Sequence, residues 1–190
     1  MSGWIILGLI VAVGLYAIML FNRLVGLRNQ VANGWKQIDV QLKRRYDLIP
    51  NLVEVVKDYM SYEQETLRQV IEARNRAQTA NTGKATAESL EAEGALTASI
   101  GRLFALSENY PNLKADGNVQ KLMEELTGTE NKIAFARQFY NDSAMSMNNA
   151  VESFPSNLVA RQFRFQKADY FEIPEAERAV VQQPVKVDLR

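Results

Sequence analysis

An apolar stripe with helical spacing runs through the first part of the chain and limits what it can fold into. The stripe consists of Leu24, Leu27, Val31, Trp35, Ile38, Leu42, Tyr46, Ile49, Val53, Val56 and Met60. Its mean spacing of about 3.6 residues is that of an α-helix, and nothing here alternates with a period of two. Because the stripe continues through Leu67 and Val70, it predicts one helix over residues 22–80, roughly 90 Å long.

Pro50 lies inside this stripe. Proline lacks the backbone N–H that a helix interior needs, so it kinks or ends a helix. Since the stripe keeps its phase across Pro50, the sequence favours a kinked helix. The alternative is a hairpin at residues 47–50, which would give four helices of similar length.

The rest of the chain also carries helical patterns. A polar turn at residues 79–84 separates the first helix from a second at 86–110, which ends because Pro111 excludes Tyr110 from the helical region. A turn at 115–118 leads to a third helix at 119–153, and Ser156 is a candidate cap for a short helix at 157–165. The expected fold is all-α, an antiparallel bundle of three to four helices over residues 23–165. Residues 166–190 are expected to be a loosely ordered tail, or, because 185–189 alternate, to add a strand to a partner.

Residues 3–21 form an uncharged, mostly apolar segment of about 19 residues, enough to cross the ~30 Å hydrocarbon core of a bilayer. The expected anchor spans residues 1–22 and continues into the long helix. A cleavable signal peptide is disfavoured, because no basic residue precedes the segment and no small-residue cleavage site follows it. The features singled out in the anchor are interfacial aromatics and a small-residue pair that either seats a second helix or reflects composition alone: Trp4, Gly8, Ala12, Tyr16 and Phe21.

Three basic residues follow the anchor closely: Arg23, Arg28 and Lys36. The positive-inside rule then places the bundle in the cytoplasm and the N-terminus outside a bacterial inner membrane, which the chain crosses once. The same charges are placed to contact anionic lipid headgroups, and topology and lipid contact are compatible roles.

Composition removes most enzyme classes. The chain has no His and no Cys, which excludes thiol nucleophiles, disulfides, histidine acid–base catalysis and ordinary zinc sites. Its formal net charge is zero, so no global field attracts nucleic acid. No phosphate loop, dinucleotide fingerprint or zinc-peptidase motif is present. Carboxylate chemistry with a hard metal, or a Ser or Lys acting without His, stays open, but we predict no catalytic residue, cofactor or metal.

One dense polar cluster interrupts the amphipathic pattern. It comprises Asp39, Lys43, Arg44, Arg45 and Asp47 on the first helix with Glu130 and Arg137 on the third. Asp39 and Asp47 are separated by about 12 Å of helical rise, too far to share one ion. The favoured interpretation is structural: Asp39 pairs with Lys43, and Arg45 pairs with Glu130 or another acid across the bundle, which fixes helix register. A ligand pocket near residues 129–131 and Arg137 is the alternative.

Several segments carry a family resemblance. Residues 38–54, IDVQLKRRYDLIPNLVE, resemble the signature of the bacterial LemA family, and the segments at 73–74, 110–115, 129–133, 140–142 and 154–157 agree with it. Departures are Met147, where the family usually has Tyr, and Arg164, where it usually has Gly. The resemblance spans roughly residues 21 to 189 and implies a small membrane-anchored helical protein without established enzymatic activity. The family includes a protein of magnetosome membranes, which implies a membrane-organising role.

These observations lead to one functional expectation and one alternative. The first is a non-enzymatic scaffold that binds membrane lipid, self-associates, and organises or shapes the membrane. The alternative is an adaptor of a membrane protease or envelope quality-control complex, with a membrane protein as partner.

A comparison of helix lengths predicts the self-association surface. A second helix of about 40 Å covers the first only down to about residue 53. Leu24, Leu27, Val31 and Trp35 would then lack partners within the chain, and an uncovered apolar stripe marks an interface. The alternatives are that residues 166–190 cover the stripe or that it lies in the lipid headgroups.

Overall fold

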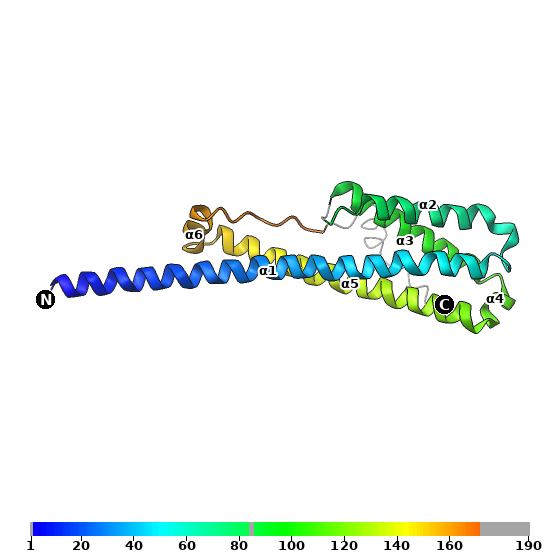
Figure 1. Ribbon diagram of the computed structural model, residues 1–190, viewed down its shortest axis with the longest axis horizontal. Helices are drawn as coiled ribbons and strands as arrows, with labels where there is room; N and C mark the ends of the chain where they lie inside the picture. The colour runs from blue at the N-terminus through cyan, green and yellow to red at the C-terminus, as the bar shows by residue number, and fades with distance from the viewer. Residues whose placement is uncertain (1, 84–85, 172–190) are drawn as a thin grey trace, which may run out of the picture. The chain divides into compact units, whose positions relative to one another are not determined.

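The computed structural model describes residues 2–83 and 86–171, and all regular structure in them is helical, with no strand (Figure 1). The all-α prediction is therefore confirmed for the described residues. In chain order the elements are α1 (Ser2–Val56), the 3-10 turn η1 (Ser61–Glu63), α2 (Gln64–Ala80), α3 (Ala87–Ser107), α4 (Pro111–Ala115), α5 (Gly117–Glu152) and α6 (Ser156–Gln162).

The described residues fall into two compact units. Unit 1 holds residues 2–38 and 135–170, and unit 2 holds residues 39–83, 86–134 and 171. The helices α1 and α5 each contribute to both units. The predicted boundaries at residues 22 and 165 separate anchor, bundle and tail, whereas the two units are groups of residues in contact. Those boundaries therefore stay predictions.

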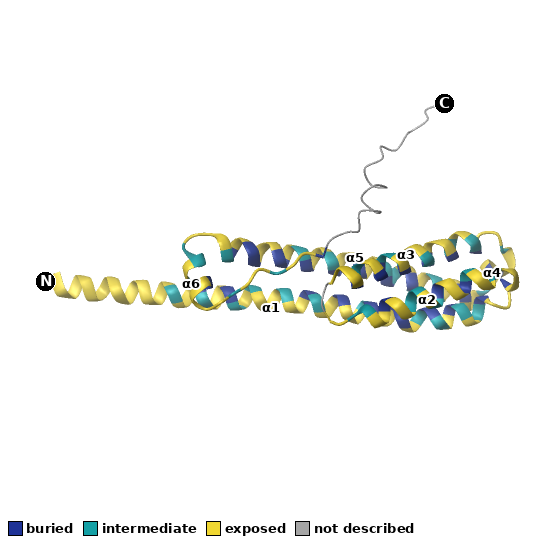
Figure 2. Ribbon diagram, turned by 90° about the horizontal axis from the view of Figure 1, so that it is seen from above, coloured by how far each residue is buried: buried dark blue, intermediate teal, exposed yellow. Residues whose placement is uncertain are grey.

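Unit 2 is built from the apolar faces of α1, α2, α3 and α5. In Figure 2 buried positions follow one side of each of these helices. They include Leu42, Ile49 and Leu52 of α1, Leu67 and Val70 of α2, Leu96, Ile100 and Leu103 of α3, and Leu126 and Ile133 of α5. This pattern of three- and four-residue steps is the reason that the segments fold as packed amphipathic helices.

The chain reverses direction between α1 and α2, so the prediction of one helix over residues 22–80 is wrong beyond Val56. Two hydrogen bonds show that α2 returns antiparallel along α1: Arg74 Nε donates to the Tyr46 carbonyl over 3.0 Å, and Asn81 Nδ2 donates to Asp39 Oδ1 over 2.9 Å. Pro50 lies inside α1, as expected, and the alternative hairpin at residues 47–50 is wrong.

Burial of Met60 explains why the stripe did not reveal this reversal. Met60 lies in the turn itself and is fully buried, while its N–H donates to the Val56 carbonyl over 2.9 Å. Leu67 and Val70 are buried on α2 in turn. The same apolar side chains therefore fill one core whether the chain continues straight or folds back.

The later helices lie close to their predicted positions. Thr86 and Ser89 form a reciprocal capping box that begins α3. Ser156, the candidate cap of the last helix, is instead its first residue, and its Oγ donates to the carbonyls of Ala150 and Ser153. The short helix α4 was not predicted.

The start of the predicted tail is held against α5 within unit 1. The side chain of Asn148 makes two hydrogen bonds with the backbone of Ala168, of 2.9 and 2.8 Å, and Tyr140 Oη donates to the Asp169 carbonyl over 2.9 Å. Residues 166–170 therefore form an ordered strap. The rest of the predicted tail, including the candidate strand at 185–189, lies outside the described residues.

In unit 1, α1 and α5 approach closely at Gly34. A Cβ atom on Gly34 would lie 3.1 Å from Tyr140 Cα, which is tighter than an ordinary contact. The next residue, Trp35, packs edge-on against the Tyr140 ring, with centroids 5.8 Å apart. A side chain at position 34 would therefore require α5 to move away by a few tenths of an ångström.

Replacing Gly34 by Leu should therefore lower the stability of the full chain in detergent. Overpacking costs about 1–3 kcal/mol, of which better helix propensity recovers roughly 0.8 kcal/mol. Gly26 is the matched control, because a Cβ there would meet nothing within 4 Å, so Gly26→Leu should keep or raise the melting temperature. Equal melting temperatures, measured by circular dichroism, would contradict this packing.

Candidate functional site

A buried cluster of charged side chains joins three helices of unit 2. The Arg45 side chain of α1 is fully buried and forms ion pairs with Glu93 of α3 and Glu130 of α5. Arg45 Nη1 lies 2.9 Å from Glu130 Oε1 and 3.0 Å from its Oε2, and the same nitrogen donates to Thr97 Oγ1 over 3.1 Å. The Tyr46 hydroxyl donates to Glu93.

The sequence places these charges on the apolar faces of their helices. Arg45 follows Leu42 by three residues, and Glu93 precedes Leu96 by three. Residues three or four apart share a helix face, so each charged side chain projects into the core. The Arg45–Glu130 pair expected from the sequence is present, whereas Glu93 was not named as a member of the cluster.

Electrostatics within the cluster favour a structural role. Two carboxylates surround one guanidinium, and Glu130 alone of the three keeps partial exposure, 24% of its side chain. Burial raises the pKa of the Tyr46 hydroxyl, which the nearby Arg45 charge only partly offsets. Tyr46 therefore stays protonated and donates to Glu93. The charged groups of the cluster thus bind one another. Buried ion pairs of this kind fix the register of the helices more than they stabilise the fold.

Other members of the predicted cluster lie at the surface or elsewhere. The predicted pair Asp39–Lys43 is wrong, because Asp39 accepts a hydrogen bond from Asn81 and, in the described part of the chain, makes no ion pair with Lys43. Arg44 forms an exposed pair with Glu125 at 3.7 Å, which contributes little. The side chain of Asp47 is exposed, and Arg137 is half-buried in unit 1.

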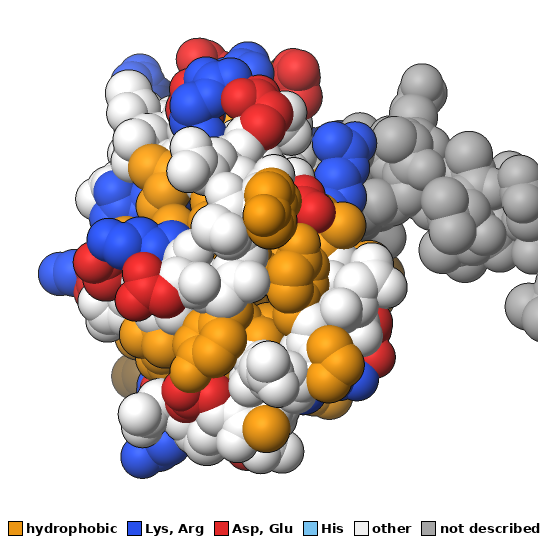
Figure 3. Space-filling view, turned by 90° about the vertical axis from the view of Figure 1, so that its right-hand side faces the viewer, with side chains coloured by type: hydrophobic (Ala, Val, Ile, Leu, Met, Phe, Trp, Pro, Cys, Tyr) orange, Lys and Arg blue, Asp and Glu red, His pale blue; other side chains and the backbone are white. Residues whose placement is uncertain are grey.

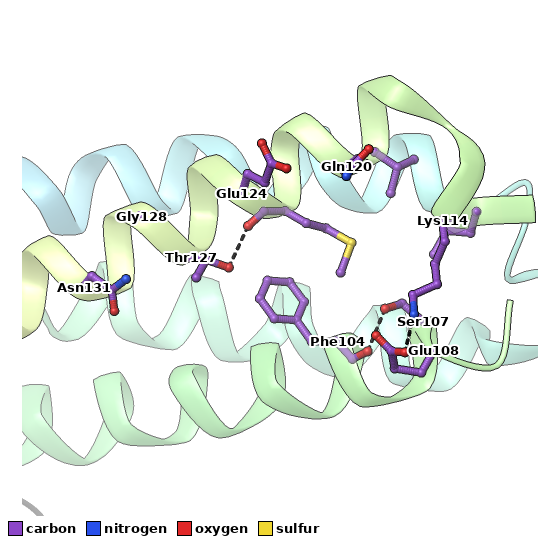
Figure 4. Close-up of a pocket in the computed structure, with 12 residues that line it drawn as sticks. Phe104, Ser107, Glu108, Lys114, Gln120, Glu124, Thr127, Gly128 and Asn131 are labelled. Carbon is purple, nitrogen blue, oxygen red and sulfur yellow. Dashed lines mark hydrogen bonds and ion pairs between the residues drawn. The ribbon is translucent and has the colours of Figure 1, made fainter. Parts of the chain in front are cut away.

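A pocket of about 570 Å³ lies among α3, α4 and α5 in unit 2 (Figure 4). Of the residues proposed for a ligand pocket, Asn131 lines it. The hydroxyl groups that line the pocket bind backbone within their own helices: Ser107 donates to the Phe104 carbonyl and Thr127 to the Met123 carbonyl. Thr129 is buried and donates in the same way to Glu125. Most of the lining surface is apolar, although charged side chains such as Glu108 and Lys114 border it.

Figure 3 shows apolar side chains among charged ones over the end of unit 2 where η1 and α4 lie. Tyr62 is 94% exposed there. Tyr59 donates a 2.8 Å hydrogen bond to Asp116, which also accepts from the backbone N–H groups of Asn118 and Val119. The Tyr59 hydrogen bond is the largest of the effects that lower the Asp116 pKa, followed by the two backbone donors. Asp116 thus caps α5 rather than offering a free carboxylate.

The N-terminal part of α1 is the second candidate site, and its apolar side chains are exposed (Figure 2). Among the described helices, α1 is long and apolar enough to cross a membrane. Trp4 and Tyr16 are exposed, a Cβ on Gly8 would meet nothing, and Ala12 is exposed. Phe21 is half-buried, and the basic residues Arg23, Arg28 and Lys36 are exposed.

The stripe predicted to drive self-association is covered within unit 1. Leu24 is buried in a cluster with Ala150 and Ala160, and Leu27 packs against it. Val31 is half-buried and Trp35 packs on Tyr140. The premise that these residues lack partners in the chain is therefore wrong. The covers considered from the sequence were the second helix and residues 166–190, whereas the cover comes from α5 and α6.

Comparison with known proteins gives consistent relatives. The sequence model of the LemA family matches residues 34–188. The chain is 24% identical over 178 residues to magnetosome protein MamQ 2 of Paramagnetospirillum magneticum, covering 82% of this chain and 65% of that protein. It is 26% identical over 160 residues to protein LemA of Metamycoplasma hominis, covering 84% and 72%. The chain thus spans a little under two thirds of the MamQ 2 length. It is a membrane-associated helical protein that belongs to the LemA family.

Proposed function

We propose that this protein is a non-enzymatic, membrane-anchored scaffold that self-associates at the cytoplasmic face of the bacterial inner membrane. The observation that carries the proposal is the continuity of α1, which runs from exposed apolar residues near Trp4 to packed residues at Val56 without a break. A helix that is suited to lipid at one end and packed at the other links bundle to membrane without a flexible linker. Such a link suits a protein that organises its neighbours.

The chemistry of the chain supports a non-enzymatic role. The sequence has no His and no Cys. The buried cluster at Arg45 pairs its charges internally, and the pocket near Phe104 engages its hydroxyl groups with backbone carbonyls. Relatives named magnetosome proteins support a role at an organised bacterial structure.

The proposed topology is testable by cysteine labelling, because the sequence contains no Cys. In intact spheroplasts, a membrane-impermeant maleimide should label Ser2→Cys and not Tyr62→Cys, since Arg23, Arg28 and Lys36 favour a cytoplasmic bundle. Tyr62→Cys should be labelled after permeabilisation, as expected of a side chain that is 94% exposed. The reverse pattern would contradict the topology.

Self-association needs a surface other than the covered stripe. On α5, Phe135 and Phe139 are one turn apart and are 72% and 43% exposed, which forms an apolar ridge. Anchors hold all copies in one plane, and this confinement makes a weak contact effective. We assign the contact between copies to this ridge.

Oxidative crosslinking in native membranes tests this assignment. Phe135→Cys should give a disulfide-linked homodimer, whereas Asn149→Cys, exposed further along α5, should give much less. If cysteine-reactive crosslinkers instead give one dominant product with a different protein, the scaffold is contradicted. That result would support the adaptor of a membrane protease or quality-control complex.

A further inference from the structure

Three large apolar side chains are exposed on and around α6. Phe154, Leu158 and Phe163 lie within ten residues of one another, and their exposed fractions are 78%, 60% and 59%. The opposite side of α6 is packed, since Ala160 is buried and Val159 contacts the cluster at Leu24. One side of this short segment therefore holds it to unit 1, and the other presents apolar groups outward.

This segment lies at the level where the apolar part of α1 ends. Phe21 is the last residue of that part, and its ring contacts Phe163 and Phe165 at centroid distances of 4.8 and 5.7 Å. If residues 3–21 cross the hydrocarbon core, Phe21 lies at its boundary, and Phe163 lies there with it. Aromatic side chains are enriched at that depth.

The charges around α6 match an anionic membrane surface. Arg161 and Arg164 are exposed, and the Arg28 guanidinium lies 5.4 Å from the centre of the Phe165 ring. Lys167 forms an ion pair with Glu152, so these two charges offset each other. Arg23 and Arg28, which follow the anchor, and Arg161 and Arg164, in and after α6, are exposed, and juxtamembrane basic residues are attracted to anionic headgroups.

Arg164 occupies a conformation that usually belongs to glycine. Its φ of 56° lies in the left-handed region, where a side chain is disfavoured. It follows the end of α6 and lies between Phe163 and Phe165 in the sequence. A cation is thus kept between two aromatic residues at a position where glycine would be the less strained residue.

We propose that α6 and its flanking residues form a second membrane contact, in which Phe154, Leu158 and Phe163 enter the interface of an anionic bilayer and Arg161 and Arg164 contact its headgroups. This contact rests on the proposed anchoring by α1. It fixes unit 1 to the bilayer at two points, and lipid composition then regulates how firmly the bundle is held.

Fluorescence quenching of the full chain in vesicles tests this contact. Single-cysteine variants Leu158→Cys and Phe163→Cys carry an environment-sensitive label in vesicles of phosphatidylcholine and phosphatidylglycerol. Brominated lipid should quench both labels, and aqueous iodide should quench them weakly. Tyr62→Cys, exposed in unit 2, should show the opposite pattern. Changing Arg161 and Arg164 to Gln should reduce lipid quenching in anionic vesicles, and little in vesicles of phosphatidylcholine alone.

A label at Ile10→Cys separates failure of this inference from failure of the anchor. If lipid quenches position 10 but not positions 158 and 163, the second contact is wrong and the anchor stands. If lipid quenches none of them, both are wrong. Labels at 158 and 163 that are shielded from iodide and lipid alike would show that protein covers α6, which also overturns the inference.

A measurement on the unsubstituted chain guards against misfolded variants. A photoreactive phosphatidylglycerol should crosslink to residues 154–163, mapped by mass spectrometry. Crosslinks confined to residues 3–21 would contradict the second contact.

Discussion

Replacing Arg45 by Met is expected to destabilise the protein by about 3–5 kcal/mol, because the change leaves Glu93 buried and charged without its cation. Denaturant unfolding of the full chain in detergent, followed by circular dichroism, measures the loss. The neighbouring Arg44 is the matched control, since its ion pair with Glu125 is exposed and long at 3.7 Å. Arg44→Met should change stability by about 0–1 kcal/mol. Similar losses in both variants would contradict the buried cluster.

A charge-free version of the cluster separates a structural role from a functional one. Combining Arg45→Met with Glu93→Gln and Glu130→Gln removes the uncompensated charges and keeps an acceptor for the Tyr46 hydroxyl. Most of the lost stability should return, because buried ion pairs can be replaced at little cost. If the stable triple variant still forms the Phe135→Cys crosslink, the cluster serves folding alone. A triple variant as unstable as Arg45→Met would show that buried charge is not the cause.

The cluster also shows what the sequence revealed and what it concealed. The Arg45–Glu130 pair was predicted because both residues interrupt apolar stripes. Glu93 was missed although it lies three residues before Leu96 and seven before Ile100, a spacing that puts it on the buried face of α3. The signal was present in the periodicity. An acidic residue near a helix N-terminus is favoured by the helix dipole whichever face it occupies, so its presence there does not by itself indicate burial.

The reversal after α1 was harder to predict from the sequence. A hairpin of two helices that both pack on one core needs the same periodic apolar residues as a straight helix. The turn at residues 57–63 contains neither Gly nor Pro, and its buried Met60 continues the stripe. By contrast, the polar turn at residues 79–84 and Pro111 marked boundaries of the later helices, because local backbone chemistry acts there independently of tertiary packing.

Periodicity also gave the wrong prediction for the membrane-proximal stripe at residues 24–35, which was expected to lack partners within the chain. Periodicity shows that Leu24 needs an apolar partner but not whether that partner comes from the same chain. The structure supplies Ala150 of α5 and Ala160 of α6. The two small residues allow the helices to approach Leu24, and the hydrogen bond from Ser156 Oγ to the Ala150 carbonyl holds the connection between α5 and α6. The fully buried part of the covering surface thus consists of alanines, which carry a weak periodic signal, and Val151, Val159 and Phe165 pack around it.

Leu24→Ala distinguishes an intrachain core from an interface between copies. Because Leu24 is 1% exposed within the chain, its truncation should cost about 2–5 kcal/mol and make residues 155–165 more sensitive to protease. Val40 is the control, since it lies on the same helix and is 62% exposed, so Val40→Ala should change stability little. An interface role would give a different result, with the melting temperature unchanged and oligomers lost in mild detergent. We expect the melting temperature to fall while the Phe135→Cys crosslink persists below it, because the core under α6 and the ridge on α5 are separate surfaces of unit 1.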